Sequence, residues 1–158
     1  MSGRIEFSKE YFAPETRCNY LVSRTMKSVW AAQLEVLVHI AEICERHGIR
    51  FYAMFGTLLG AVRHKGYIPW DDDLDIGMLR EDYMGFLEVA GEELPPEYQI
   101  LSVYTNPKGL TSGMRVTNGI MIELAGKRME EYHGCPFVVG IDIFPLDYEP
   151  LDAAARAE

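Results

Sequence analysis

The chain has 158 residues, of which 48% are hydrophobic and 25% charged, a balance that fits one globular domain and excludes a disordered chain. Its formal net charge is -9 without a compensating lysine and arginine cluster, which excludes a nucleic-acid groove. No apolar run approaches the roughly 20 residues that cross a bilayer, residues 1–12 lack the apolar segment of a signal peptide, and the three cysteines are widely spaced. We therefore expect a cytoplasmic protein with no transmembrane segment and no nucleic-acid partner.

Two helices and a short strand are expected in the first half of the chain. Apolar side chains recur at three- and four-residue spacing over residues 20–47, which predicts a helix that ends at the glycine that follows. An aromatic-rich run over residues 51–55 predicts a strand. A short helix is expected over residues 57–64, with Thr57 as its N-cap and Lys65-Gly66 at its end.

The second half of the chain alternates strands, one helix and turns. An Asn-Gly pair at 118–119 favours a tight turn, so a hairpin is expected over residues 114–124. The run FVVGIDIF, residues 137–144, is apolar enough for a central strand. Helices between the strands of a mixed sheet indicate an α/β or α+β fold. The other expected elements are a loop at 68–70, a strand over 73–79, a helix over 81–93, a strand over 99–104 and a loop over 106–112.

Four aspartates lie within five residues: Asp71, Asp72, Asp73 and Asp75. Alternate side chains of a strand point to opposite faces, so Asp73 and Asp75 share one face while Leu74 points to the core. Two neighbouring carboxylates repel each other unless a cation lies between them, and oxygen ligands suit Mg2+. Mg2+ is usually held by one or two carboxylates together with substrate phosphates. The pattern therefore predicts a metal-dependent enzyme that acts on a phosphate ester.

A fifth aspartate, Asp142, lies in the middle of the last apolar run. Ile141 and Ile143 flank it, so its side chain points away from theirs. A charged side chain in a buried strand is costly unless it is paired or metal-bound. If this strand lies beside the strand of Asp73 and Asp75, the three carboxylates converge on one site. The alternative is an aspartate that caps a loop or pairs with an arginine.

Two blocks of the sequence resemble the LicD family of phosphocholine transferases and their fukutin-related relatives. The blocks are FGTLLGAVRHKGYIPWDDDLDIGM, from Phe55 to Met78, and HGCPFVVGIDIFPLDYEP, from His133 to Pro150. Between them, MRVTN at Met114–Asn118 resembles the family's intermediate basic strand. The resemblance implies a fold of the nucleotidyltransferase superfamily, with a mixed sheet flanked by helices.

The same resemblance implies a division of the chain. Family members generally continue past the second block with a helical part, which this chain is expected to lack. The implied parts are an N-terminal extension at 1–19, the nucleotidyltransferase-like domain at 20–150 and the truncated start of a C-terminal helix at 151–158. Assembly into a homo-oligomer is one way in which such a chain would complete its site.

The resemblance also implies roles for particular side chains. Asp73 and Asp75 are implied to be paired metal ligands, with Asp142 as the third acidic residue, and these three form the implied catalytic set. Asp71 is implied to assist the metal, whereas Asp72 is left outside the ligand set. Residues implied to approach or contact the nucleotide phosphates are Gly56, Thr57, Arg63, His64, Lys65 and Arg115. Glycine permits close backbone approach, and arginine suits bidentate phosphate contacts. For each basic residue the alternative is an ordinary surface charge.

The implied reaction transfers a phospho-alcohol group from a CDP-linked donor to a glycan hydroxyl and releases CMP. Mg2+ (or Mn2+) is the implied cofactor, because a divalent cation would neutralise the donor diphosphate. In-line displacement needs little beyond positioning and charge neutralisation. Choline is the default alcohol, so CDP-choline is the expected donor, and ribitol or another polyol is the nearest variant.

Three other functions are weighed against this one. A calcium-binding EF-hand is excluded, because its sixth and twelfth loop positions would be Ile76 and Asp82 rather than Gly and Glu. A different nucleotidyltransferase shares the Gly-Thr turn and the spaced aspartates. A non-catalytic relative that binds nucleotide or metal is favoured by the short C-terminus and opposed by the retained acidic set.

Overall fold

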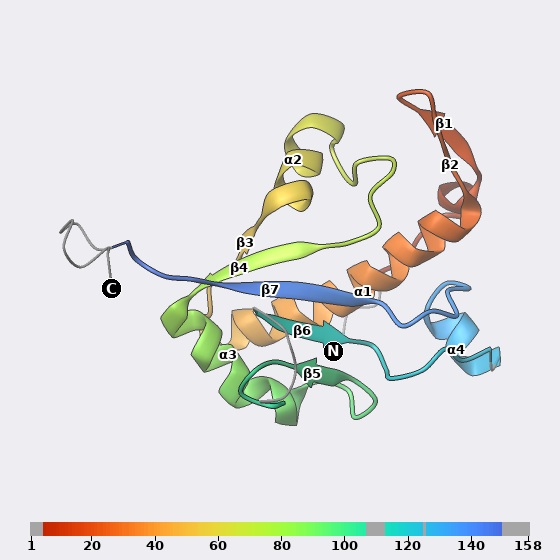
Figure 1. Ribbon diagram of the computed structural model, residues 1–158. Helices are drawn as coiled ribbons and strands as arrows, with labels where there is room; N and C mark the ends of the chain where they lie inside the picture. The colour runs from red at the N-terminus through yellow and green to blue at the C-terminus, as the bar shows by residue number, and fades with distance from the viewer. Residues whose placement is uncertain (1–4, 107–112, 125, 150–158) are drawn as a thin grey trace.

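The computed structural model describes residues 5–106, 113–124 and 126–149 (Figure 1). The loop expected over 106–112 lies almost wholly outside these ranges, and the helix start expected over 151–158 lies entirely outside them. The helices are the 3-10 helix η1 (Lys9–Phe12) and α1 (Arg24–His47), α2 (Phe55–His64), α3 (Arg80–Glu93) and α4 (Gly126–Glu131). The strands are β1 (Glu15–Arg17), β2 (Tyr20–Val22), β3 (Tyr52–Ala53), β4 (Asp75–Leu79), β5 (Gln99–Leu101), β6 (Met114–Thr117) and β7 (Gly140–Leu146). None of the helices in the described ranges is both long and apolar enough to span a bilayer.

Five strands form one mixed sheet, in the order β3-β4-β7-β6-β5. β4 and β7 run parallel, and the other neighbouring strands of this sheet run antiparallel. β1 and β2 form a separate antiparallel hairpin, whose turn residues Cys18 and Asn19 both have positive φ, as a type I′ turn requires. A mixed sheet flanked by helices confirms the expected α+β class.

Helices α1 and α3 cover one face of the five-stranded sheet (Figure 1). They pack against each other and against β7, and the buried side chains between these layers form the core. α2 contacts β4 and lies away from the side that α1 and α3 occupy. The buried apolar side chains that the three central strands contribute are Ile76, Met78, Met114, Val116, Ile141 and Ile143.

The long helix α1 begins at Arg24, later than the helix predicted from residue 20. Ser23 is its N-cap, because the Met26 amide donates a hydrogen bond to the Ser23 hydroxyl at 3.1 Å. The preceding residues, Tyr20–Val22, form β2 instead. The predicted end is confirmed: Gly48 has a left-handed φ of 67° and closes the helix.

The prediction of Thr57 as a helix N-cap was wrong. α2 begins at Phe55, and the N-cap residue, Met54, makes no side-chain capping bond. The Thr57 hydroxyl instead accepts a hydrogen bond from the Asp75 amide at 2.8 Å. This bond joins α2 to the first residue of β4. The predicted end of α2 is confirmed, since Lys65 takes a left-handed φ of 58° directly after it.

The prediction of a hairpin at Asn118-Gly119 was also wrong. β6 ends before this pair and is hydrogen-bonded to β5 on one side and β7 on the other. Asn118 is fully buried, and its side-chain oxygen accepts hydrogen bonds from the Val139 amide at 3.0 Å and from the Arg128 guanidinium at 3.1 Å. These long-range contacts, one of them to the unpredicted helix α4, override the local preference for a tight turn.

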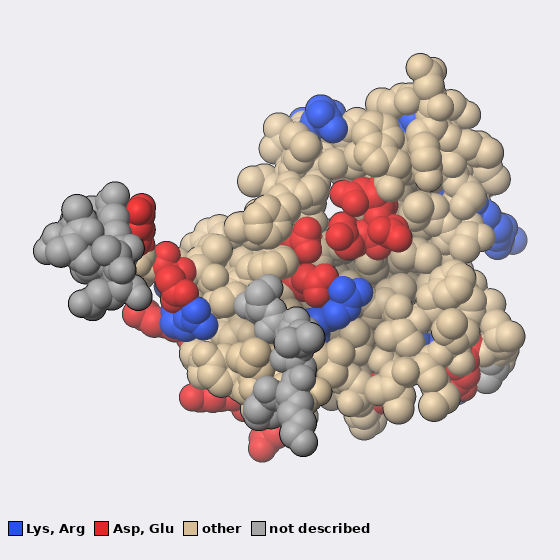
Figure 2. Space-filling view, viewed as in Figure 1, with Lys and Arg blue, Asp and Glu red and all other residues tan. Residues whose placement is uncertain are grey.

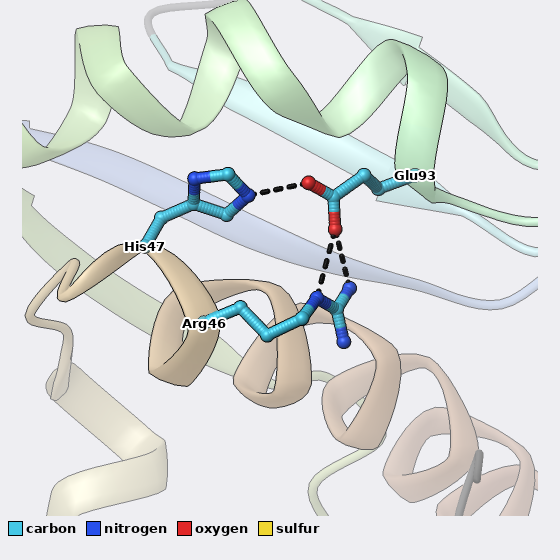
Figure 3. Close-up of polar contacts among 3 residues, drawn as sticks. All are labelled: Arg46, His47 and Glu93. Atoms are coloured by element: carbon cyan, nitrogen blue, oxygen red, sulfur yellow. Dashed lines mark hydrogen bonds and ion pairs between the residues drawn. The ribbon is translucent and has the colours of Figure 1, made fainter.

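A cluster of polar contacts joins the C-terminal ends of α1 and α3 (Figure 3). Glu93 of α3 accepts hydrogen bonds from the Arg46 guanidinium, at 2.5 and 3.0 Å, and contacts the His47 ring. Hydrogen bonds from Arg46 and then His47 lower the pKa of the Glu93 carboxyl. The cluster connects the two helices that cover the sheet.

Candidate active site

A row of three charged side chains crosses β4, β7 and β6 on the face of the sheet opposite α1 and α3. Asp75 is in register with Asp142, and Asp142 is in register with Arg115. Cross-strand partners share a face, and the Arg115 guanidinium donates a hydrogen bond to Asp142 Oδ2 at 2.7 Å. Figure 2 shows acidic side chains gathered in a hollow between α2 and the sheet, with a basic group beside them. The strands of Asp75 and Asp142 are therefore neighbours, as convergence of the carboxylates requires.

Asp71 and Asp73 lie in the loop before β4, which passes close to the first turn of α2. A Cβ atom on Gly56 would lie 2.5 Å from Asp71 Oδ2, so a larger residue here would displace the Asp71 carboxylate. Leu74 is buried between Asp73 and Asp75, which confirms the predicted alternation. The start of α2 is thus in direct contact with the acidic loop.

The backbone at the start of α2 is strained. Phe55 has a φ of 43°, a left-handed conformation that is rare for a bulky side chain. Its ring packs edge-on against Phe144 of β7, with the ring centroids 5.1 Å apart. Such strain costs about 1–3 kcal/mol and is commonly retained at functional sites. The strained residue, Phe55, lies directly before Gly56, which is the residue of α2 that lies against Asp71.

Helix α1 holds the backbone of the acidic loop, a role that the sequence interpretation missed. The Trp30 indole donates a hydrogen bond to the Asp71 carbonyl, and the Gln33 amide donates one to the Asp72 carbonyl, each at 2.8 Å. The Tyr67 hydroxyl donates to Gln33 Oε1 at 3.1 Å. Gln33 is only 2% exposed, and a polar residue on the apolar face of a predicted helix is the signal that identifies it.

The carboxylates of the loop and of the adjoining strands β4 and β7 repel one another. Burial and then the charge of Asp73 raise the pKa of Asp71. Burial, followed by the charges of Asp73, Asp142 and Asp71, raises the pKa of Asp75 to about 6, while Arg115 acts in the opposite direction. The site therefore favours loss of negative charge, by protonation or by binding of a cation.

A divalent cation fits this set of residues when the protein supplies only part of its coordination. Carboxylate oxygens are suitable ligands for Mg2+ and Mn2+. Across the described part of the chain, no three histidine, cysteine, aspartate or glutamate side chains are placed so that they could hold a metal ion. A cation here would be held by one or two carboxylates, and substrate phosphates would supply further oxygens, as is usual for Mg2+.

The basic residues predicted to contact phosphates divide into two groups. Arg115 lies within the acidic site. Arg63 and His64 end α2 and Lys65 follows it, about 10–14 Å along the helix axis from Gly56 at 1.5 Å per residue. There Arg63 donates a hydrogen bond to the His64 ring at 3.0 Å, and the Lys65 ammonium donates one to the Val62 carbonyl. The His64 ring also lies edge-on to Trp70, the residue before Asp71, with the ring centroids 6.2 Å apart.

The alternative environment weighed for Asp142, pairing with an arginine, is present in the structure. Its partner is Arg115, on the neighbouring strand. The pair is partly exposed, with 40% of the Arg115 side chain and 29% of the Asp142 side chain accessible. Both groups therefore stay available to a ligand in the hollow.

Comparison with known proteins identifies the family. Residues 48–149 match the LicD/FKTN/FKRP nucleotidyltransferase domain. The chain is similar to the lipopolysaccharide cholinephosphotransferase LicD of Haemophilus influenzae, with 39% identity over 87 residues, 51% of this chain and 33% of that protein. It is also similar to the ribitol 5-phosphate transferase FKRP of human and mouse, with 37% identity over 59 residues, 37% of this chain and 12% of each relative.

These relatives are longer proteins, and the match spans a third or less of each of them. The matched domain contains β4, β6, β7 and α2, and so every residue of the acidic site. The predicted resemblance is confirmed, and the chain belongs to the LicD/FKTN/FKRP nucleotidyltransferase-domain family.

Proposed function

We propose that this chain transfers a phospho-alcohol group, phosphocholine by default, from a CDP-linked donor to a glycan hydroxyl and releases CMP. The observation that carries the proposal is the row of Asp75, Asp142 and Arg115, with Asp71 and Asp73 beside it. The similarity to a lipopolysaccharide cholinephosphotransferase supports both the phosphocholine group and the glycan acceptor.

The side chains of the site suit different parts of this reaction. Asp73 and Asp75 would hold Mg2+ (or Mn2+) together with the donor phosphates, with Asp71 beside them, and the cation when bound neutralises the diphosphate charge. Arg115, a bidentate donor, would contact a phosphate of the donor. Gly56 lets the donor phosphates approach the backbone at the start of α2, where free amides favour anions.

Asp142 would receive the proton of the attacking hydroxyl. In the transfer, the acceptor oxygen forms a bond to the distal phosphorus, and the bond from that phosphorus to the CMP oxygen breaks. The electron pair leaves with CMP, and the proton of the hydroxyl passes to the Asp142 carboxylate. The hydrogen bond from Arg115 orients this carboxylate on its strand.

A polyol phosphate is the second candidate for the transferred group. The similarity to a ribitol 5-phosphate transferase is the observation that favours it. The acidic site serves both donors equally, because both carry the same diphosphate. The three free thiols, two of them buried, support the further proposal of a reducing, cytoplasmic setting.

Release of CMP is the test of this proposal. CDP-choline and CDP-ribitol are each incubated with the chain, Mg2+ and a lipooligosaccharide acceptor, and CMP and the phosphorylated glycan are quantified. We expect product from one donor, none in EDTA and none from the double variant Asp73→Asn, Asp75→Asn. Glu88→Gln, an exposed carboxylate on α3, is the matched control and should keep full activity. Folded protein that binds and turns over neither donor would contradict the proposal.

A further inference from the structure

Two cavities adjoin the acidic site, and they differ in chemistry. One, of about 380 Å³, lies between the first turn of α1 and the residues that lead into β7, and Asp72 and Arg115 are part of its wall. The other, of about 260 Å³, lies under α2, and Asp71 and Asp73 are part of its wall. We name them the α1 cavity and the α2 cavity.

The α1 cavity combines polar and apolar groups. Ser23 and Thr25 contribute hydroxyls, Phe137 contributes an aromatic ring that is 40% exposed, and Val138 contributes an apolar side chain. Hydroxyls and an aromatic ring suit a heterocyclic base, which has polar edges and a stacking face. The volume lies within the range of about 300–1,000 Å³ that is typical of ligand pockets.

The α2 cavity does not suit a nucleoside. Apart from its two aspartates, Thr57 and Tyr67, its wall is apolar or small, with Leu34, Leu37 and Ala61 among the residues. The Tyr67 ring already stacks on Trp30, and its hydroxyl donates a hydrogen bond to Gln33. The polar edge of a base would lose its hydrogen bonds with water there without replacement, which is unfavourable. The wall of the α1 cavity holds one carboxylate, Asp72, and the cation Arg115, which belongs to the row of Asp75, Asp142 and Arg115.

We propose that the α1 cavity binds the nucleoside of the CDP-linked donor, with Arg115 between the nucleoside and the aspartates. This rests on the proposed function, since the donor must be a nucleoside diphosphate. It gives the donor a direction across the sheet: the base lies at α1 and the diphosphate at Arg115. The attacked phosphorus then lies at the row of Asp75 and Asp142. CMP leaves toward the α1 cavity, and the acceptor hydroxyl approaches from the opposite side, as in-line displacement requires.

The two cavities are tested by filling each with one large side chain. Thr25→Trp fills the α1 cavity from an exposed position in the first turn of α1, and Ala61→Trp is the matched variant in the α2 cavity; both residues are exposed. CDP and inorganic pyrophosphate are titrated into each protein by calorimetry with Mg2+, and circular dichroism checks the fold. A third variant, Phe137→Ala, removes the ring.

We expect Thr25→Trp to weaken CDP binding at least tenfold and Phe137→Ala to weaken it about tenfold, while pyrophosphate binding stays within twofold in both. Ala61→Trp should bind CDP as the unmodified chain does. If Thr25→Trp binds CDP normally, or if Ala61→Trp alone abolishes binding, the α1 cavity is not the nucleoside site, although the proposed function stands. If the folded, unmodified chain binds pyrophosphate but not CDP, both proposals are overturned.

Discussion

The two faces of the central sheet carry opposite chemistry on adjacent rows of the same three strands. Ile76, Ile143 and Met114 are in register on the face that α1 and α3 cover, and all are at most 2% exposed. One residue away in each strand, Asp75, Asp142 and Arg115 form the row on the other face. Because side chains alternate along a strand, a shift of one residue would exchange the two rows. The covered row fixes the register and so positions the charged row.

The two rows also contribute oppositely to stability. Burial of apolar surface on the covered face stabilises the fold. On the other face, burial and then the like charges of the neighbouring aspartates raise the pKa of Asp75 to about 6. A folded-state pKa above the ordinary value means that the charged form is less stable in the folded chain than in the unfolded one. The acidic row is therefore retained at a cost to stability, as is common for functional sites.

The largest expected effect comes from moving a carboxylate onto the covered face. Ile143→Asp buries a charge without a partner, and we expect it to lower the free energy of unfolding by more than about 4 kcal/mol. That is a large part of the roughly 5–15 kcal/mol that stabilises a typical domain. Urea denaturation followed by circular dichroism measures it. A normally stable Ile143→Asp variant would show that the register of β7 is wrong.

The reciprocal change on the charged face should affect activity and leave the fold intact. Asp75→Asn removes a proposed cation ligand, and we expect about a 10³-fold loss in the rate of CMP release, equivalent to several kcal/mol. Because the change also removes repulsion, the melting temperature without divalent cation should be equal to or above that of the unmodified chain. A variant that loses activity only because it unfolds would contradict this separation of the two faces.

A smaller effect is expected where α2 meets the acidic loop. Gly56→Ala places a Cβ atom 2.5 Å from Asp71 Oδ2, so we expect Asp71 to move and CMP release to fall about tenfold, the size of effect that misplaced supporting groups produce at metal sites. Gly85→Ala in α3 is the matched control, because a Cβ atom there meets nothing within 4 Å. It should stabilise the helix by about 0.5–1 kcal/mol. Equal activity in the two variants would show that the Gly56 contact is not required.

The smallest effect concerns the reactivity of the cysteines. Burial raises the pKa of the Cys44 thiol to about 12 and also raises that of Cys135, and both side chains are buried, whereas Cys18 is exposed in the β1–β2 turn. Alkylation requires the thiolate, so iodoacetamide at pH 8 should label Cys18 alone in the folded chain. Mass spectrometry locates the label, and denaturant should make all three react. Rapid labelling of Cys44 in the folded chain would indicate that the covered face opens readily.

The sequence predicted the features that depend on local pattern. The separation of Asp142 from Ile141 and Ile143 follows from the period of a strand, and the structure has it. The predicted alternation of burial at Asp73, Leu74 and Asp75 is also present, although β4 begins at Asp75 and not at Asp73. These features need no knowledge of distant residues.

The features that the sequence did not predict depend on distant contacts. The Thr57 hydroxyl bonds to the Asp75 amide rather than to its own helix. Asn118 is held by Val139 and Arg128, so its turn preference has no effect. Trp30 and Gln33 reach the acidic loop across about 40 residues of sequence. No local pattern encodes these pairings, because they form only once the strand order brings the segments together.

The central claim is that the charged row is a cation-dependent phosphate site, and one titration tests it most directly. CDP is titrated by calorimetry into the unmodified chain and into Asp75→Asn, with Mg2+ and then with EDTA. We predict binding to the unmodified chain that depends on Mg2+ and is lost in Asp75→Asn, although both proteins are folded. Binding that is equally tight in EDTA, or that survives in Asp75→Asn, would contradict the claim.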